Sequence, residues 1–339
     1  PPRISFFVEW YFTHEDIECM FSKDALDLLK GHGASIYLRI PECNLTANSH
    51  AEKVTKLLNK EGIPTWAWLT TKPEHGYYYS DETARYFPGL VQRVHAWADS
   101  RDLSFKGMML DAEPSLQHRR SQSESAKRGD YLGAWSTFRS QFNDTAHDSS
   151  LKMTKQIVHD LHSFGYEAAY CGPDLYLEDF QDGDEDLMQL HGVPGAIDGF
   201  DKFIPMIYRS LYPWTEKLDH DYYIYSSAKH YLERYGSQLS VALGTLGKGA
   251  YGSPREGDDG LKLLRSDVLV LRNLGVPEIP LWCLEWLLWH RWSTYSSDLE
   301  YILSSATGPA MESSITFSPM HLQVRSILLT LDFLMDTSI

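Results

Sequence analysis

The stretch Phe105-Lys-Gly-Met-Met-Leu-Asp-Ala-Glu-Pro114 carries the pattern from which the fold can be inferred. An apolar run with the length of a β-strand leads directly into two carboxylates, Asp111 and Glu113. Amphipathic segments of helical length lie before and after it in the chain. In parallel β/α proteins the catalytic side chains come from the carboxyl ends of the strands, so this stretch predicts a strand and part of an active site.

Seven other apolar runs repeat the pattern, and longer helical segments separate them. The eight predicted strands are residues 4–10, 34–40, 65–69, 105–111, 166–171, 203–208, 239–243 and 279–284. The predicted helices include residues 51–60, 83–100, 131–164, 220–235, 261–274 and 321–335. A glycine stands shortly before several of the strands, as Gly62 and Gly165 do, which is how a helix commonly ends before the next strand. Eight such units predict an α/β fold, a single (β/α)8 TIM barrel.

An open, doubly wound sheet is the rival fold, and it normally has a glycine-rich phosphate loop after its first strand. Here the first strand ends in Glu9-Trp-Tyr-Phe, which favours the barrel. We therefore expect one domain over residues 1–339, with long loops after strands three, four and seven. The polar segments 115–130 and 254–260 are the predicted loops after strands four and seven, and both would lie at the catalytic end of the barrel.

Composition and charge exclude several classes of partner. The formal net charge of −15 would repel a phosphate backbone, and the sequence has no basic stripe, so we expect no binding to nucleic acid. The longest apolar run, residues 279–289, is too short for a membrane span and contains Glu285. Aromatic residues make up 13% of the chain, and flat rings stack well on sugars, which favours a carbohydrate partner.

The four cysteines form no Cys-x-x-Cys pair, and we expect neither a metal site nor a cofactor. Cys19 and Cys43 would form a disulfide only in an oxidising compartment, and the sequence leaves this open. Two glycosylation sequons, at Asn44 and Asn143, and a first residue other than Met favour a secreted protein.

Side chains at the ends of the predicted strands form the candidate site. In strand order, they are Glu9, Arg39, Trp66, Trp68, Asp111, Glu113, Tyr170, Asp174, Met206, Tyr208, Arg209, Trp282 and Glu285. Arg39 requires a carboxylate partner inside a barrel, and Glu9 and Glu285 are the candidates. Trp66 and Trp68 share one face of their strand, where they either fill the core or stack on a sugar. The run Tyr77–Tyr79 is expected to form a rim around an extended ligand.

The Asp111 and Glu113 pair is the main candidate for catalysis. Two carboxylates two residues apart on a strand point the same way, and their mutual repulsion raises the proton affinity of one of them. Glu113 could then stay protonated near neutral pH and act as a general acid. The plainer alternatives are a solvated pair of acids or a pair of metal ligands.

Four of these segments resemble the family-18 glycoside hydrolases, which comprise chitinases, endo-β-N-acetylglucosaminidases and non-catalytic chitinase-like lectins. Residues 105–114 are similar to the family's fourth-strand motif, Asp-x-Asp-x-Glu, and Pro205-Met-Ile-Tyr208 is similar to its Met-x-Tyr element. Residues 280–285 resemble its eighth strand, a tryptophan followed by an acid, and residues 4–10 resemble its aromatic first strand. The sequence departs from the full motif at Lys106 and Met109, where the family has aspartates.

The resemblance implies substrate-assisted hydrolysis of a glycan. Glu113 would protonate the glycosidic oxygen, and the 2-acetamido oxygen of the substrate would attack the anomeric carbon. Asp111 would orient the acetamido group, Tyr208 would donate a hydrogen bond to its oxygen, and Trp282 would form the floor beneath the sugar.

Three other hypotheses stay open on the sequence alone. A hydrolase without substrate assistance would use Glu9 or Glu285 as its nucleophile or base. A non-catalytic barrel would bind carbohydrate without cleaving it. A metal-dependent hydrolase would bind a divalent cation through Glu9, Asp111, Glu113 and Asp174.

Overall fold

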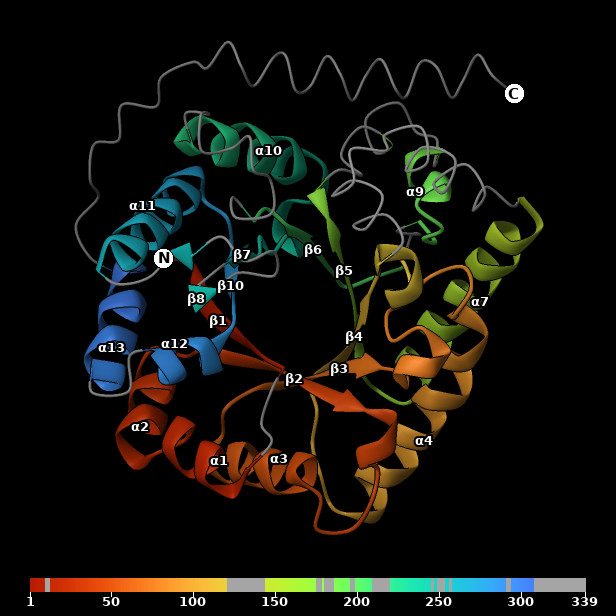
Figure 1. The fold of residues 1–339 in the computed structure, drawn as a ribbon, viewed down its shortest axis with the longest axis horizontal. Helices are drawn as coiled ribbons and strands as arrows, with labels where there is room; N and C mark the ends of the chain where they lie inside the picture. Colours follow the sequence, from red (N-terminus) through yellow and green to blue (C-terminus); the bar gives the residue numbers. More distant parts are fainter. Residues whose placement is uncertain are drawn as a thin grey trace.

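A computed structural model shows the chain as a ring of strands enclosed by helices (Figure 1). It describes residues 1–9, 13–120, 144–174, 179, 186–195, 199–208, 220–244, 247–248, 254–255, 258–290 and 294–307. The strands of the main sheet are β1 (Arg3–Val8), β2 (Ser35–Pro41), β3 (Thr65–Thr70), β4 (Gly107–Asp111), β5 (Glu167–Pro173), β6 (Lys202–Met206), β7 (Leu243–Gly244) and β10 (Glu278–Trp282). The α-helices are α1 (His14–Met20), α2 (Lys23–Gly31), α3 (His50–Glu61), α4 (Phe87–Ser100), α7 (Asp144–Ser163), α9 (Asp186–Leu190), α10 (His220–Tyr235), α11 (Asp258–Leu274), α12 (Leu284–His290) and α13 (Tyr295–Ser305). Short 3₁₀ turns are η1 (Glu42–Asn44), η2 (Pro73–His75), η3 (Ala84–Tyr86) and η6 (Gly236–Gln238).

The sheet is parallel and closes on itself, as the sequence predicts for a (β/α)8 barrel. Its eight strands follow the order β6-β5-β4-β3-β2-β1-β10-β7. Parallel bridges from Phe203 to Leu239 and from Met206 to Ala242 join β6 to the chain that enters β7, and so complete the ring. Each of the eight predicted strands overlaps one of these strands, and residues 239–243 also include the bridged segment that leads into β7.

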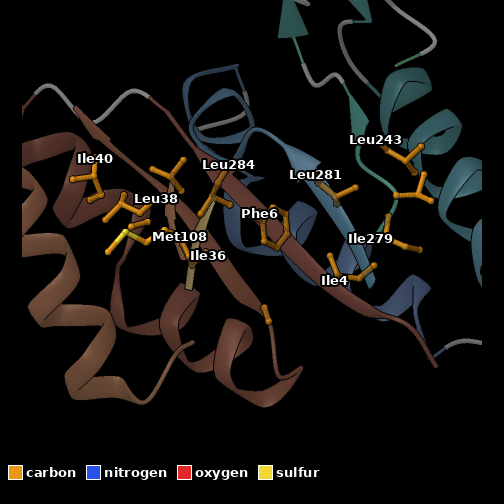
Figure 2. Packing of buried hydrophobic residues seen from close by; sticks show 14 of the residues in the cluster. Ile4, Phe6, Ile36, Leu38, Ile40, Met108, Leu243, Ile279, Leu281 and Leu284 are labelled. Atoms are coloured by element: carbon orange, nitrogen blue, oxygen red, sulfur yellow. The ribbon is translucent and has the colours of Figure 1, made fainter. Parts of the chain in front are cut away.

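Two-residue alternation divides the buried side chains into two clusters. The outer cluster fills the space between the strands and the helices, and includes Ile4, Phe6, Ile36 and Leu38 (Figure 2). Residues of the opposite parity, such as Phe7 and Tyr37, point into the barrel. The interior is therefore a packed core, as in other barrels of this type, and the outer cluster attaches the helices to it.

The lower part of the barrel interior, near the amino ends of the strands, is polar. Lys202 on β6 forms a buried ion pair with Glu278 on β10 and also donates a hydrogen bond to the hydroxyl of Tyr37, 3.1 Å away. Tyr37 in turn donates to Glu278 over 3.2 Å, and Ser5 donates to the same carboxylate. Because buried charges are costly unless they are paired and hydrogen-bonded, this network keeps the interior compatible with a closed barrel.

Local sequence signals set the helix boundaries. Ser49 precedes α3, and its side chain accepts a hydrogen bond from the backbone of Glu52, while Gly62 ends the helix in the left-handed conformation at φ 71°. Thr13 and Asp16 form a capping box at the start of α1. These caps satisfy backbone groups that the helix ends would otherwise leave without partners.

Several expectations are corrected. Residues 116–120 are helical although a loop is predicted there, and residues 254–255 pair with residues 247–248 in a small antiparallel ribbon before α11 begins at Asp258. Leu284, placed in the last strand, instead begins α12. Residues 131–143 of the predicted helix 131–164 and the whole predicted helix 321–335 lie outside the described residues. The same is true of residue 10 of the first predicted strand and of residues 121–130 of the predicted loop.

The structure also describes the state of the cysteines and the character of the helices. All four cysteines, including Cys19 and Cys43, carry free thiols. Within the described ranges, no helix is both long enough and apolar enough to cross a membrane.

The interior also explains why Gly107 stands in β4. A Cβ atom at this position would lie 2.3 Å from the backbone oxygen of Glu167 and 2.4 Å from the ring of Trp66. We expect Gly107→Ala to lower the free energy of unfolding by at least about 1–3 kcal/mol, the usual cost of overpacking a core. Chemical denaturation monitored by circular dichroism would measure the change.

Gly89 is the matched control, because it lies in the first turn of α4 and a Cβ there would meet only the flexible end of Arg93, at 3.2 Å. Gly89→Ala should leave stability unchanged or raise it by about 0.5–1 kcal/mol. Equal destabilisation by the two substitutions would contradict the packing assigned to Gly107.

Candidate active site

A cavity of about 60 Å³ lies at the carboxyl ends of the barrel strands. Its walls come from the ends of β1, β3, β4, β5, β6 and β10 and from the segments that follow β3 and β4. The lining residues are Phe7, Glu9, Trp68, Tyr78, Met109, Asp111, Glu113, Arg119, Cys171, Met206, Tyr208 and Trp282. Seven of these twelve are among the predicted site residues: Glu9, Trp68, Asp111, Glu113, Met206, Tyr208 and Trp282.

Asp111 and Glu113 lie together in this cavity. Asp111 ends β4 and is 3% exposed, and Glu113 follows two residues later with only 15% of its side chain exposed. Burial raises the pKa of Asp111, and the negative charges of Glu113 and Glu9 raise it further. Burial also raises the pKa of Glu113, and the positive charge of Arg119 opposes that rise. The pair therefore takes up a proton at higher pH than isolated carboxyl groups would.

Arg119 reaches Glu113 from the helical residues 116–120. Its Nη1 atom lies 2.7 Å from the Oε2 atom of Glu113, and its guanidinium group lies 5.2 Å from the centre of the Tyr78 ring. Arg119 and Tyr78 are both cavity residues that belong to segments after the strands and not to the barrel itself. The cavity thus carries one direct carboxylate–guanidinium pair on its wall.

Glu9 is held on the opposite side by a chain of hydrogen bonds. The hydroxyl of Tyr77 donates to Glu9 over 2.8 Å, and Arg39 donates to the same hydroxyl over 2.6 Å. Glu285, which is fully buried, accepts a hydrogen bond from the backbone of Glu9 at 2.9 Å. Burial raises the pKa of Glu9, while Tyr77 and Arg39 lower it. Arg39 therefore acts on Glu9 by its charge and through the Tyr77 hydroxyl, which stands between the two groups.

The aromatic residues leave polar atoms directed at the cavity. Trp282 and Tyr208 stack with their ring centres 6.3 Å apart, and Trp68 completes this wall. Oδ1 of Asp111 and Nε1 of Trp68 are both buried in this cavity, and neither makes a hydrogen bond of good geometry within the part of the chain that the structure describes. Trp68 nevertheless lies close enough to Asp111 for its N–H to lower the pKa of that carboxyl group. Because buried polar atoms usually have well-formed hydrogen bonds, this weak contact leaves the Asp111 carboxylate able to accept a hydrogen bond from a ligand.

Five predicted site residues do not line the cavity: Arg39 and Glu285, which lie beside Tyr77 and Glu9, and three that lie farther away. Trp66 points into the barrel like Trp68 but one layer lower, where it is fully buried, stacks on Tyr37 and lies beneath Lys202. Tyr170 has the outward parity of β5, so it packs in the outer cluster and donates to the backbone oxygen of Pro194. Asp174 is buried in a hydrogen bond with Tyr223.

Two predictions remain to be placed. Arg209 lies outside the described residues. In the run Tyr77–Tyr79, only Tyr78 lines the cavity, because Tyr77 is buried beneath it and Tyr79 packs on Phe87 and contacts Thr154. The run therefore does not form the predicted rim.

The sequence analysis missed four cavity residues, Phe7, Met109, Cys171 and Arg119. Phe7, Met109 and Cys171 could have been found by alternation, because each has the inward parity of its strand: Phe7 and Met109 stand two residues before Glu9 and Asp111. Arg119 comes from the segment after β4, and no periodic pattern indicates which side chains of such a segment turn inward.

The described part of the chain contains no group of three or more His, Cys, Asp or Glu side chains arranged to hold a metal ion. The proposed cation site also requires Asp174, which lies outside the cavity and is bonded to Tyr223. The four carboxylates named for that site are therefore not brought together.

Comparison with solved structures places the fold among barrel glycoside hydrolases. The chain is similar to the glycoside hydrolase domain of PgaB (BpsB) from Bordetella bronchiseptica, with a TM-score of 0.52 at 11% identity over 89% of this chain and 99% of that one. It is also similar to the endo-β-1,4-mannanase of Thermotoga petrophila (TM-score 0.53, 10% identity, 92% of this chain and 78% of that chain). Catalytic domain 2 of the Ostrinia furnacalis Group II chitinase gives a TM-score of 0.50 at 12% identity, over 94% and 99% of the two chains.

No protein-family model matches the sequence, and no curated protein sequence matches it significantly. The similarity is therefore one of fold, and it bears out a distant resemblance to family-18 hydrolases and other glycoside hydrolases that share the barrel.

The buried charge of Asp111 should cost stability. A carboxyl group whose folded-state pKa is raised destabilises the folded protein above that pKa and has no effect below the unfolded value, where both states are protonated. We expect Asp111→Asn to raise the melting temperature at pH 7.5, by roughly 2–4 °C for each kcal/mol of repulsion removed. The difference in melting temperature between Asp111→Asn and wild type should shrink towards zero as the pH falls to about 4. Thermal unfolding across this pH range measures it.

Asp99→Asn is the control, since Asp99 is exposed near the end of α4 and the substitution removes the same charge. It should leave the melting temperature nearly unchanged at every pH. If Asp111→Asn were destabilising to the same degree at pH 4 and pH 7.5, the burial cost assigned to Asp111 would be wrong.

Proposed function

We propose that this protein hydrolyses a glycan by general-acid catalysis, with Glu113 as the acid and a 2-acetamido group of the substrate as the nucleophile. One observation carries the proposal: the buried Asp111 and the half-buried Glu113 line the same cavity, which is walled by aromatic rings and lies at the carboxyl ends of the strands of a (β/α)8 TIM barrel. The cavity combines a proton donor, a second carboxylate and flat apolar walls, which are the groups that cleavage of a glycosidic bond requires.

The environment of Glu113 supports its role as the acid. A general acid has to hold a proton near the working pH, and burial raises the pKa of Glu113 in that direction. Proton transfer from a well-placed acid typically accelerates a reaction about 10²–10⁴-fold. Asp111 is suited to remain beside it as a hydrogen-bond acceptor, because its Oδ1 atom has no partner among the described residues.

The polar atoms of the cavity suit an acetamido group. Asp111 Oδ1 would accept the hydrogen bond of the acetamido N–H, and the hydroxyl of Tyr208 would donate to the acetamido oxygen. Trp282, stacked on Tyr208, would support the sugar from below. These three groups are the ones that the family-18 resemblance assigns to the same tasks.

The reaction then proceeds in two balanced steps. Glu113 gives its proton to the glycosidic oxygen as the bond to the anomeric carbon breaks, and the acetamido oxygen bonds to that carbon to form an oxazolinium ion. Water then attacks the anomeric carbon and gives a proton to the Glu113 carboxylate, which restores the acid and opens the oxazolinium ring. Two displacements at one carbon retain its configuration.

The other carboxylates are better suited to supporting roles. Glu9 accepts a hydrogen bond from Tyr77, and Glu285 is fully buried beneath Glu9, outside the cavity lining. Met109 stands where the resembled motif has an aspartate, and besides burial it is the charges of Glu113 and of Glu9, which follows β1, that raise the pKa of Asp111. This arrangement favours substrate assistance over a nucleophile supplied by Glu9 or Glu285.

The chitinase, mannanase and glycoside hydrolase domain that share the fold support a glycan as the substrate class. A non-catalytic carbohydrate-binding barrel is the alternative, and the presence of Glu113 favours the enzyme. Each hypothesis predicts binding of a sugar, so turnover has to be measured to distinguish them.

We expect Glu113→Gln to lower the rate of glycan hydrolysis at least about 10²-fold while substrate binding and thermal stability stay close to wild type, because glutamine has the shape of the acid but no proton to give. Wild type and variant are each incubated with four hexasaccharides, which are built from N-acetylglucosamine, glucosamine, glucose and mannose. The products are identified by mass. Cleavage should be confined to the N-acetylated oligomer.

Glu15→Gln, on the exposed surface of α1, is the control for loss of one glutamate and should retain full activity. Cleavage of the de-N-acetylated hexamer at a comparable rate would rule out substrate assistance and direct attention to Glu9. Saturable binding of the N-acetylated hexamer by wild type without any turnover would favour the carbohydrate-binding barrel.

A further inference from the structure

The contact between Arg119 and Glu113 is not explained by the reaction as described so far. A general acid must carry a proton, whereas an ion pair with arginine stabilises its charged form. Yet the guanidinium group lies 2.7 Å from the carboxylate inside the same cavity. Either the contact is incidental, or it controls the acid.

Arg119 is held in place by packing and by backbone hydrogen bonds. The backbone N–H of Leu116 donates to the oxygen of Gly76 over 3.1 Å, and that of Arg119 donates to the oxygen of Ser115 over 2.9 Å. The segment after β4 is thereby attached to the segment after β3. The Arg119 side chain then passes over the ring of Tyr78 to reach Glu113.

The join between these two segments leaves little room for movement. A Cβ atom at Gly76 would lie 2.5 Å from the Thr83 side chain and 3.2 Å from Ser115, and Gly76 has φ 99°, which disfavours other residues. Ser115 itself is buried. The position of Arg119 is therefore built into the fold, which argues against an incidental surface contact.

We propose that Arg119 is a positioning residue for the hydrolysis: it fixes the orientation of the Glu113 carboxyl group and governs when that group carries a proton. The inference rests on the proposed function, because it gives Arg119 a role only if Glu113 acts as the acid. Arg119 acts through Glu113 and is not itself required to touch the substrate.

The charges around Glu113 make the sign of the effect clear. Asp111 at the end of β4 and Glu9 just after β1 contribute negative charge. Cys171 on β5, Tyr78 and Tyr208 are neutral groups whose pKa values burial raises. Arg119 supplies the positive charge in direct contact. Removing it leaves the acid among carboxylates and neutral groups, so Glu113 would hold its proton to higher pH.

The first test measures the proton on Glu113 directly and needs no ligand. Protein labelled with ¹³C at the glutamate side-chain carboxyl is titrated by NMR, and the Glu113 resonance is the one lost in Glu113→Gln. In Arg119→Gln we expect this titration to move upward by about 1–3 pH units, the usual effect of losing an opposite charge at this range. Arg119→Lys keeps the charge and should stay near wild type.

The second test is the pH dependence of kcat/KM on the N-acetylglucosamine hexamer. The rate should fall at high pH where Glu113 loses its proton, and in Arg119→Gln this fall should move to higher pH by the same interval as the NMR titration. Loss of orientation should lower the maximal rate in Arg119→Gln, with partial rescue in Arg119→Lys. Arg120→Gln is the control, because Arg120 is the exposed neighbour with the same charge and should change neither measurement.

The two tests separate the two proposals. An unchanged Glu113 titration in Arg119→Gln overturns the role of Arg119, whether or not the hexamer is cleaved. A shifted titration with an unshifted rate profile also overturns it, since the acid in the reaction would then be another group. A shifted titration in a protein that cleaves none of the four hexasaccharides overturns the proposed hydrolysis and, with it, any catalytic role for the ion pair.

If Arg119→Gln does not fold, Gly76→Ala provides an independent route, because it strains the join that carries Arg119 without altering any charge. It should move the Glu113 titration upward as the guanidinium group is displaced. A folded Gly76→Ala protein in which both Glu113 and the rate profile stay at wild-type values would overturn the proposal.

Discussion

The structure depends on one constraint: a closed ring of eight parallel strands leaves an interior that its own side chains must fill. Every second residue of each strand points inward, so each strand contributes to successive layers from its amino end to its carboxyl end. Along β1 and the residue that follows it, these are Ser5, Phe7 and Glu9, which are in turn polar, aromatic and acidic. The layer nearest the carboxyl ends of the strands lines the cavity that holds Asp111 and Glu113. The layers below it set the position of these two carboxyl groups along the barrel axis.

The lowest layer shows how the barrel accommodates charge without a ligand. Lys202 and Glu278 pair directly, and Tyr37 and Ser5 supply further hydrogen bonds to the same carboxylate. Breaking a buried pair of this kind by removing one partner typically costs about 3–5 kcal/mol. The upper layer is different, because its carboxylates outnumber its cations among the described residues. In addition, Oδ1 of Asp111 makes no hydrogen bond of good geometry with any described residue. Charge is neutralised at the end of the barrel that needs only stability and is left partly uncompensated at the end proposed to carry chemistry.

Most of the barrel could be predicted because its strands are apolar runs between helix signals, and the acidic motif after residue 110 identified the end of the barrel that holds the cavity. The errors have two physical causes. Tyr170 and Asp174 were assigned by nearness to a strand end, whereas alternation turns Tyr170 outward and Asp174 is bonded to Tyr223. Trp66 has the correct parity but lies one layer too low, beside Lys202. Arg119 could not have been found, and the run Tyr77–Tyr79 could not be resolved to Tyr78, because the path of a segment between a strand and a helix depends on contacts that only the folded chain creates.

The size of the cavity bears on how the site would work. At about 60 Å³ it is smaller than the roughly 300–1,000 Å³ of most small-molecule sites, so its walls must separate for a sugar ring to enter. Trp68, Tyr208 and Trp282 stand on or directly beside strands of the closed sheet and have little freedom to move, whereas Tyr78 and Arg119 belong to the segments after β3 and β4. The hydrogen bond from the backbone of Leu116 to that of Gly76 holds the two segments together, so the opening has to come from a side chain. Because Arg119 is proposed to position the Glu113 carboxyl group, the Tyr78 ring is the part of this wall that has to turn aside when a sugar enters.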